Sequence, residues 1–162
     1  MKDELLIVPA YDRVQQLQPL FRDYTKLLVD SQPGFDYYLE LQKYDDEYSD
    51  PGKKYPLPDG RLYLALVNGQ AAGCIAMRRF DEQSCEMKRL YVDPLYRGRG
   101  IGEALVRKLI DEAKTMGYRR MLLDTLPVLA SAMRMYERLG FKVTPAHAES
   151  PVAETVFMCL DL

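Results

Sequence analysis

The chain has 162 residues, of which 22 are basic and 24 acidic, for a formal net charge of −2. This length suits a single domain over residues 1–162 that needs neither disulfides nor metal for its core, and the near-neutral charge gives no reason to expect a nucleic acid or an anionic membrane as a partner. Because no segment approaches the ~18 apolar residues of a membrane span, and the chain starts with the charged stretch Met1-Lys2-Asp3-Glu4, we expect a cytoplasmic protein.

The first sixty residues predict one short strand followed by helices. Residues 5–8 form an apolar run of strand length, and Asp12 suits the N-cap of a long amphipathic helix. Pro19 should kink or divide that helix. Residues 35–48, unusually rich in tyrosine, predict a second helix, and the three prolines and two glycines of residues 49–60 predict a loop.

The middle of the chain predicts three consecutive strands. The dipeptide Asn68-Gly69 separates two apolar runs, residues 61–67 and 70–80, and is the strongest hairpin signal in the sequence. Residues 85–92 form a third strand, which Asp93-Pro94 ends. We therefore expect antiparallel pairing at the centre of the domain.

The last third of the chain predicts alternating helices and strands. A long amphipathic helix begins near Ile101 and ends at Gly117. The apolar centre of residues 120–125 is typical of a strand that is buried on both faces. A further helix and two final strands are predicted at residues 130–139, 141–144 and 155–160.

The stretch Arg97-Gly98-Arg99-Gly100-Ile101-Gly102 is the most informative in the chain, because it lies between a predicted strand and a predicted helix. Glycine lets the backbone come close to a ligand, the free N–H groups of a first helical turn point outward, and the helix dipole favours negative charge there. The pattern therefore predicts a site for a pyrophosphate. A Walker loop would need Gly-Lys-Ser/Thr, and a dinucleotide fingerprint would need another spacing of its third glycine, so neither motif fits.

These motifs together resemble the GNAT superfamily of acyl-CoA-dependent N-acetyltransferases. Residues 86–92 look like the family's fourth strand, residues 97–102 like its pyrophosphate loop, and Met135-Tyr136-Glu137-Arg138-Leu139-Gly140-Phe141 like its last helix and the strand that follows. The resemblance is specific over residues 61–144. It implies an α/β (α+β) fold with a central mixed, mostly antiparallel sheet, flanked by helices and splayed between the fourth and fifth strands.

The resemblance also implies how coenzyme A would bind. Its pyrophosphate would meet the backbone N–H groups of six loop residues, Arg97, Gly98, Arg99, Gly100, Ile101 and Gly102. Its pantetheine arm would pair, as an added strand does, with the exposed backbone of Leu90, Tyr91 and Val92. The side chains of Arg97 and Arg99 are expected to add charge-assisted contacts to the phosphates, with a purely solvated position as the alternative.

Two residues are candidates for acid–base chemistry. Tyr136 stands where the family often places a tyrosine whose hydroxyl reaches the CoA sulfur, so it is the candidate acid, with core filling as its alternative role. Glu86 is the candidate base, because a period of two puts it on the same strand face as Leu90 and Val92, where low dielectric should raise its pKa. The alternative for Glu86 is an ion pair with Lys88 or another cation.

The acceptor side is less well defined by the sequence. The tyrosines and acids of residues 35–48 fall where the family builds its acceptor site, and Asp45-Asp46-Glu47 would either attract a cationic amine or face water. Other members of the family often have an asparagine where this chain has Leu129. Asp124 and Ser131 are the candidate replacements for it.

We interpret the chain as an N-acetyltransferase that moves an acetyl group from its co-substrate acetyl-CoA to a primary amine, by direct attack in a ternary complex and without a metal. A small-molecule amine is favoured over a peptide as acceptor, and the apolar content of 48% leaves room for a homodimer. Cys74, Cys85 and Cys159 lack metal-ligand spacing and are expected to be buried, reduced thiols. Two rivals stay open, namely a non-catalytic acyl-CoA-binding or regulatory module and a protein or peptide N-acetyltransferase.

Overall fold

A computed structural model describes residues 3–162, so Met1 and Lys2 of the charged N-terminal stretch lie outside the described residues. Seven strands form one sheet in the spatial order β1-β2-β3-β4-β5-β7-β6. The strands are β1 (Leu5–Pro9), β2 (Arg61–Val67), β3 (Gln70–Arg79), β4 (Ser84–Val92), β5 (Arg120–Thr125), β6 (Lys142–Val143) and β7 (Val156–Asp161). The helices are α1 (Val14–Ser31), α2 (Phe35–Leu41), α3 (Tyr44–Ser49), α4 (Pro51–Lys54), α5 (Ile101–Met116) and α6 (Ala130–Arg138), with short 3₁₀ turns η1 (Pro94–Tyr96) and η2 (Pro127–Leu129).

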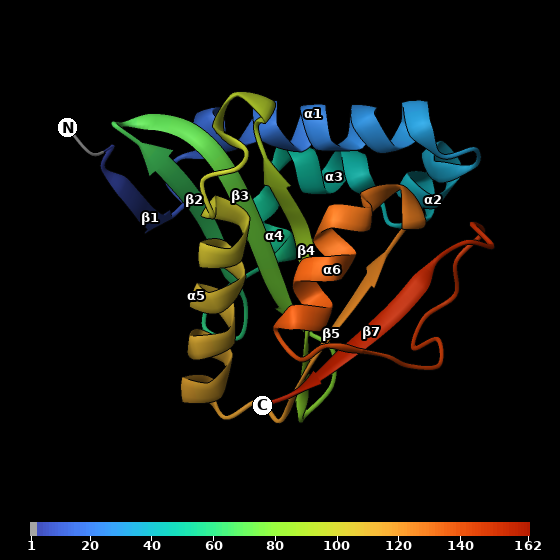
Figure 1. Cartoon of the computed structure of the whole chain (residues 1–162). Coiled ribbons are helices and arrows are strands. Elements are labelled where there is room, and N and C mark those ends of the chain that lie inside the picture. Colours follow the sequence, from blue (N-terminus) through green and yellow to red (C-terminus); the bar gives the residue numbers. More distant parts are fainter. Residues whose placement is uncertain (1–2) are drawn as a thin grey trace.

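Helices cover both faces of the sheet (Figure 1). On one face, Leu105 of α5 and Tyr136 of α6 join Ile75 of β3 in a buried cluster. On the other face, Phe21 of α1 joins Leu64 of β2 in a second buried cluster. The neighbouring strands pair antiparallel except β4 and β5, which are parallel, so the predicted mixed, mostly antiparallel sheet is confirmed. No helix within residues 3–162 is both long and apolar enough to cross a membrane.

The predicted hairpin is confirmed, whereas three details of the N-terminal helices differ from the prediction. Asn68 and Gly69 have φ values of 50° and 82°, as both central residues of a type I′ turn require. The first helix runs through Pro19 without a division, because its buried stripe packs on the sheet along its length. The predicted helix over residues 35–48 is two helices, since Lys43 adopts a left-handed φ of 56° between them. The predicted loop over residues 49–60 contains the single turn α4.

The splay between the fourth and fifth strands is confirmed. β4 and β5 pair at only three positions, and the last of these joins Glu86 to Leu122. Beyond it the two parallel strands diverge (Figure 1), so within residues 3–162 the edge of β4 that faces β5 has no strand partner from Met87 onward. An unpaired edge presents free backbone N–H and C=O groups.

A bulge in β4 changes which way its side chains point. Arg89 has a positive φ of 61°, and the pairing with β3 skips from Tyr91 opposite Cys74 to Lys88 opposite Ala76. One extra residue therefore lies on β4, and it reverses the alternation of faces along the strand. The prediction from a strict period of two is wrong here, because Glu86 lies on the opposite face of β4 from Leu90 and Val92.

Candidate active site

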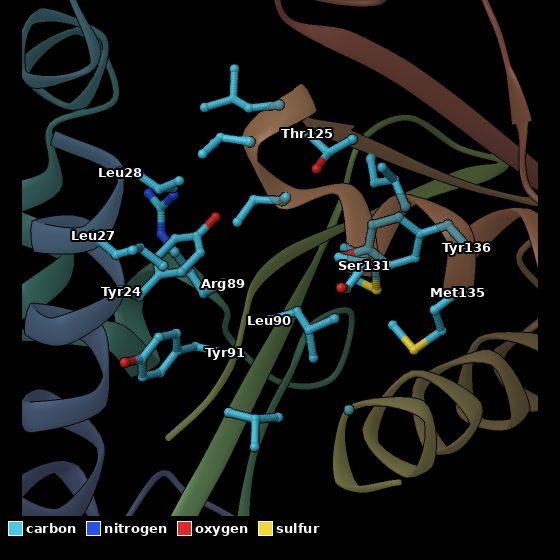
Figure 2. Close-up of a pocket in the computed structure, with 18 of the residues that line it drawn as sticks. Tyr24, Leu27, Leu28, Arg89, Leu90, Tyr91, Thr125, Ser131, Met135 and Tyr136 are labelled. Carbon is cyan, nitrogen blue, oxygen red and sulfur yellow. The ribbon is translucent and has the colours of Figure 1, made fainter. Parts of the chain in front are cut away.

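A cavity of about 660 Å³ opens where β4 and β5 diverge. It is lined by the loop before α5, by the end of β4 and by residues of α1, α2 and α6. Figure 2 shows Tyr24 and Leu28 of α1 on one side, Tyr136 of α6 on the other, and Leu90 of β4 between them. The cavity thus connects the two helical layers through the splayed sheet.

The loop before α5 has the backbone geometry that its glycines predicted. Gly98 and Gly100 have φ values of 79° and 77°, a left-handed conformation that L side chains rarely adopt. Ala104 donates its N–H to the carbonyl oxygen of Gly100 at 3.0 Å, so the earlier N–H groups of the first turn of α5 have no helical carbonyl to bind. These groups and the positive end of the helix dipole fit an anionic phosphate.

The two loop arginines occupy different positions. Arg97 lines the cavity, donates its Nε–H to the carbonyl oxygen of Val92 at 3.0 Å and stacks over the ring of Tyr91. Arg99 does not line the cavity, because its guanidinium forms an ion pair with Asp3 at 2.6 Å. The geometry therefore favours Arg97 over Arg99 as a phosphate contact.

The end of β4 presents the predicted residues to the cavity. Leu90, Tyr91 and Val92 all line it, along with Gly98, Gly100, Ile101 and Gly102 of the loop. Figure 2 shows the side chain of Leu90 between the residues of α1 and those of α6. The ring of Tyr91 makes an edge-to-face contact with the ring of Tyr24, with 6.0 Å between the ring centroids. This part of β4 is also the part whose edge lacks a strand partner.

Tyr136 faces the cavity from α6. Its ring packs against Phe141 at 5.7 Å, and within residues 3–162 its hydroxyl makes no hydrogen bond. Burial, reinforced by Tyr24 and Asp124, raises the pKa of Tyr136 above the usual value for tyrosine. The hydroxyl therefore keeps its proton at neutral pH and is free to donate a hydrogen bond into the cavity.

Glu86 lies apart from the cavity, in a cluster of opposite charges. Its side chain is 3% exposed, and its carboxylate accepts a hydrogen bond from Arg78 Nε at 2.8 Å and lies 3.3 Å from Nε2 of His147. Burial alone would raise its pKa, but the hydrogen bond from His147 and the charges of Lys88 and Arg78 lower it to about 2. The expected raised pKa is therefore wrong, since Glu86 faces these cations and not the cavity.

A polar cluster bridges the splayed strands, and the sequence, which offered Asp124 as a candidate residue, did not predict that these side chains meet. Asp124 of β5 accepts a hydrogen bond from the hydroxyl of Tyr38 of α2 at 2.8 Å and forms an ion pair with Lys88 of β4 at 3.4 Å. All three side chains line the cavity. The spacing of Lys88 and Asp124 in the sequence carries no signal, because their contact depends on where the two strands part.

A second ion pair ties the bulge to α3. The guanidinium of Arg89 donates to both carboxylate oxygens of Glu47, at 2.6 and 2.9 Å, and the two side chains are 3% and 0% exposed. Burial would raise the pKa of Glu47, but Arg89 outweighs this effect and lowers it. Asp45 and Asp46 are exposed, and none of these three acids lines the cavity. The alternative of an acidic wall at the acceptor site is therefore wrong.

The replacement candidates for the missing asparagine do line the cavity, as Leu129 itself does. Ser131 accepts a hydrogen bond from Arg134 at 3.2 Å on α6, whereas Asp124 lies on the side of α2.

The three cysteines lie inside the protein to different degrees. Cys74 and Cys85 are buried thiols, Cys159 is partly buried, and burial raises the pKa of Cys85 to about 12. Within residues 3–162, no three His, Cys, Asp or Glu side chains gather as metal ligands would.

The sequence and the fold of this chain both match those of a known protein family. The family model described as "Acetyltransferase (GNAT) family" matches residues 20–141. The chain belongs to the GNAT acetyltransferase family. Family membership makes it an acetyl-CoA-dependent acyltransferase.

Individual relatives agree with this assignment. An N-acetyltransferase of Schizosaccharomyces pombe, described as uncharacterized, is 38% identical over 164 residues that cover 100% of this chain and 98% of that protein. The N-acetylaspartate synthetase of Danio rerio is 35% identical over 107 residues that cover 65% of this chain and 38% of that protein. The solved structure of the PaiA N-acetyltransferase of Thermoplasma acidophilum, in complex with coenzyme A, has a TM-score of 0.72 at 18% identity and covers 100% of both chains. This likeness shows a shared fold.

Proposed function

We propose that the chain transfers an acetyl group from acetyl-CoA to the primary amine of a small molecule by direct attack in a ternary complex. One observation carries the proposal. A single cavity joins the glycine loop before α5 to the splay between β4 and β5, and the hydroxyl-bearing ring of Tyr136 faces that cavity from α6.

The residues present fit coenzyme A at two places. The left-handed glycines Gly98 and Gly100 bring backbone close to the cavity, and the first turn of α5 adds N–H groups suited to a diphosphate. The unpaired edge of β4 at Leu90, Tyr91 and Val92 suits an amide-bearing arm, which would bind as an added strand. Arg97 is the side chain best positioned to supplement these backbone contacts.

Tyr136 would act as the proton donor. When the amine nitrogen forms its bond to the acetyl carbon, the carbon–sulfur bond of the thioester breaks, and the departing thiolate needs a proton. The raised pKa of Tyr136 keeps its hydroxyl protonated. Among the described residues this hydroxyl donates no hydrogen bond, so its proton is available to the thiolate. The amine's own proton leaves through water or a neighbouring base.

Glu86 is a poor candidate for that base in this geometry. A carboxylate with a pKa of about 2 holds a proton weakly, and Glu86 does not line the cavity. Its contacts with Arg78 and His147 instead support a role in holding the loop between β6 and β7 against the sheet.

A small-molecule acceptor is supported by the relatives named N-acetylaspartate synthetase. Calorimetry with coenzyme A, beside thiol release from acetyl-CoA with a panel of amines and peptides, tests the proposal. We expect measurable affinity for coenzyme A and amine-dependent release of thiol. No affinity would overturn the proposal, and affinity without release would favour the non-catalytic module.

A further inference from the structure

The part of the cavity on the α1–α2 side of the splay is mostly apolar. We call it the acceptor arm. Its lining from α1, α2 and the segment after β5 includes the side chains of Tyr24, Leu27, Leu28, Phe35, Tyr38 and Leu126, with Gln42 as the polar residue at the end of α2. Figure 2 shows Tyr24, Leu27 and Leu28 together on the α1 wall. Burial raises the pKa of Tyr24 to about 12, so this phenol stays neutral at physiological pH. The arm therefore suits an apolar or aromatic body.

The charges that line the acceptor arm are already matched inside the protein. In the described part of the chain, four cations line the whole cavity. Lys88 and Arg89 of β4 lie on the side of the arm and pair with Asp124 and Glu47 at 3.4 and 2.6 Å, whereas Arg97 belongs to the glycine loop and Arg138, at the end of α6, pairs with Glu103. Lys54, a nearby cation, lies outside the lining and donates to the carbonyl oxygen of Gln42 at 3.4 Å. A carboxylate on the acceptor would thus enter the arm without a free cation, and desolvating such a charge is costly.

One carboxylate of the arm remains able to bind an amine. Asp124 is 14% exposed. Among the described residues its Oδ1 makes only the 3.4 Å contact with Lys88, whereas Oδ2 accepts the shorter hydrogen bond from Tyr38 at 2.8 Å. An ionised carboxylate has lone pairs for about four hydrogen bonds, so Asp124 has capacity left. The neighbouring ammonium of Lys88 disfavours a second positive charge there, which promotes the neutral, nucleophilic form of the amine.

We propose that the acceptor is a primary monoamine on an uncharged apolar or aromatic body, and that Asp124 binds its amino group. This inference rests on the proposed acetyltransferase function and narrows it to a substrate class. It separates this chain from relatives named for N-acetylaspartate, whose product carries two carboxylates.

Three matched amines test the charge argument, with thiol release from acetyl-CoA as the measurement. L-phenylalanine adds a carboxylate to 2-phenylethylamine, and L-phenylalaninol adds a neutral group of similar size at the same carbon. We expect kcat/KM for 2-phenylethylamine to exceed that for L-phenylalanine by roughly a hundredfold, because an unmatched charge is buried. L-phenylalaninol should stay within about tenfold of 2-phenylethylamine, and L-aspartate should be no better than L-phenylalanine.

Two pairs of variants test the residues. Asp124→Asn should weaken the calorimetric affinity of 2-phenylethylamine for the CoA-saturated protein by about tenfold and leave the affinity for coenzyme A unchanged, whereas Asp111→Asn on the exposed surface of α5 should change neither. Leu27→Arg places a free cation in the arm and should lower the preference for 2-phenylethylamine over L-phenylalanine about fivefold. Val29→Arg, equally exposed on α1 but outside the lining, should leave that preference unchanged.

The outcomes separate this inference from the proposed function. Lack of affinity for coenzyme A overturns the proposed function itself. Affinity for coenzyme A with equal or greater activity on L-phenylalanine or L-aspartate, or with no activity on any of these amines, overturns the inference about the acceptor. If Asp124→Asn does not fold, as a thermal melt would reveal, the pair Leu27→Arg and Val29→Arg still decides the charge argument.

Discussion

The two ends of the cavity are built in different ways. The loop end depends on backbone, with two left-handed glycines and a helix start supplied by one continuous stretch, residues 97–102. The acceptor arm depends on side chains from α1, α2, β4 and β5, which ion pairs hold in place. A backbone site is local in sequence and tolerates changes of side chain, whereas a side-chain site requires the complete fold and changes with single substitutions.

The largest effect is expected from breaking the ion pair behind the acceptor arm. Glu47→Gln leaves the buried guanidinium of Arg89 without its counter-charge and should lower the free energy of unfolding by about 3–5 kcal/mol, measured in urea. Asp30→Asn, which removes the exposed pair with Lys26, should lower the free energy of unfolding far less, because solvent screens that pair. Equal losses in the two variants would show that the buried pair does not support this end of the cavity.

Replacement of the proposed proton donor comes next. Tyr136→Phe removes one hydroxyl that faces the cavity, so kcat should fall roughly ten- to a thousandfold while the affinity for coenzyme A stays the same. Steady-state thiol release and calorimetry measure the two quantities. Tyr37→Phe, at a tyrosine that is 54% exposed, is the control and should be neutral. An unchanged kcat in Tyr136→Phe would assign that residue to core filling.

A test of the loop end uses two glycines with the same backbone conformation. Gly100→Val forces a β-branched residue into φ 77° at a strain of about 1–3 kcal/mol, and relaxation of the loop should weaken binding of coenzyme A about ten- to a hundredfold. Gly69→Val introduces similar strain at φ 82° in the hairpin between β2 and β3. The hairpin variant should lose stability and keep its affinity for coenzyme A; equal affinities in both variants would contradict the role of the loop.

The smallest effect on activity is expected at Glu86. Because its pKa is lowered from 4.5 to about 2, its contribution to stability is complete above about pH 4.5 and disappears as the pH falls toward 2. In Glu86→Gln the free energy of unfolding should therefore fall less steeply as the pH is lowered from about 4.5 to 2 than it does in the unmodified protein. Urea denaturation at several pH values measures this difference. Between roughly pH 6 and 9, the kcat/KM of this variant should change less than about threefold. Disappearance of the acidic limb of the pH–rate profile would restore Glu86 as the base, because a general base loses activity when it is protonated.

The parts of the site that the sequence predicted are those with a local cause. A hairpin dipeptide, a glycine loop before a helix and the position of Tyr136 on α6 each depend on neighbours within a few residues. No local sequence signal marks the bulge at Arg89, because the contact that accompanies this positive φ is made with Glu47 of the distant helix α3. Because of the same bulge, the prediction that Glu86 shares a strand face with Leu90 and Val92 is wrong. The periodicity of residues 35–48 predicted one helix, which the left-handed Lys43 divides into two.

The bulge also places one residue of β4 in contact with a helix far from it in the sequence. The two halves of β4 alternate out of phase, and the guanidinium that marks the phase change is clamped by a carboxylate of α3. The residue after Arg89 is Leu90, which lines the cavity. We therefore expect a substitution in α3 that moves Glu47 to disturb the binding of coenzyme A along β4, although α3 itself need not touch the cofactor.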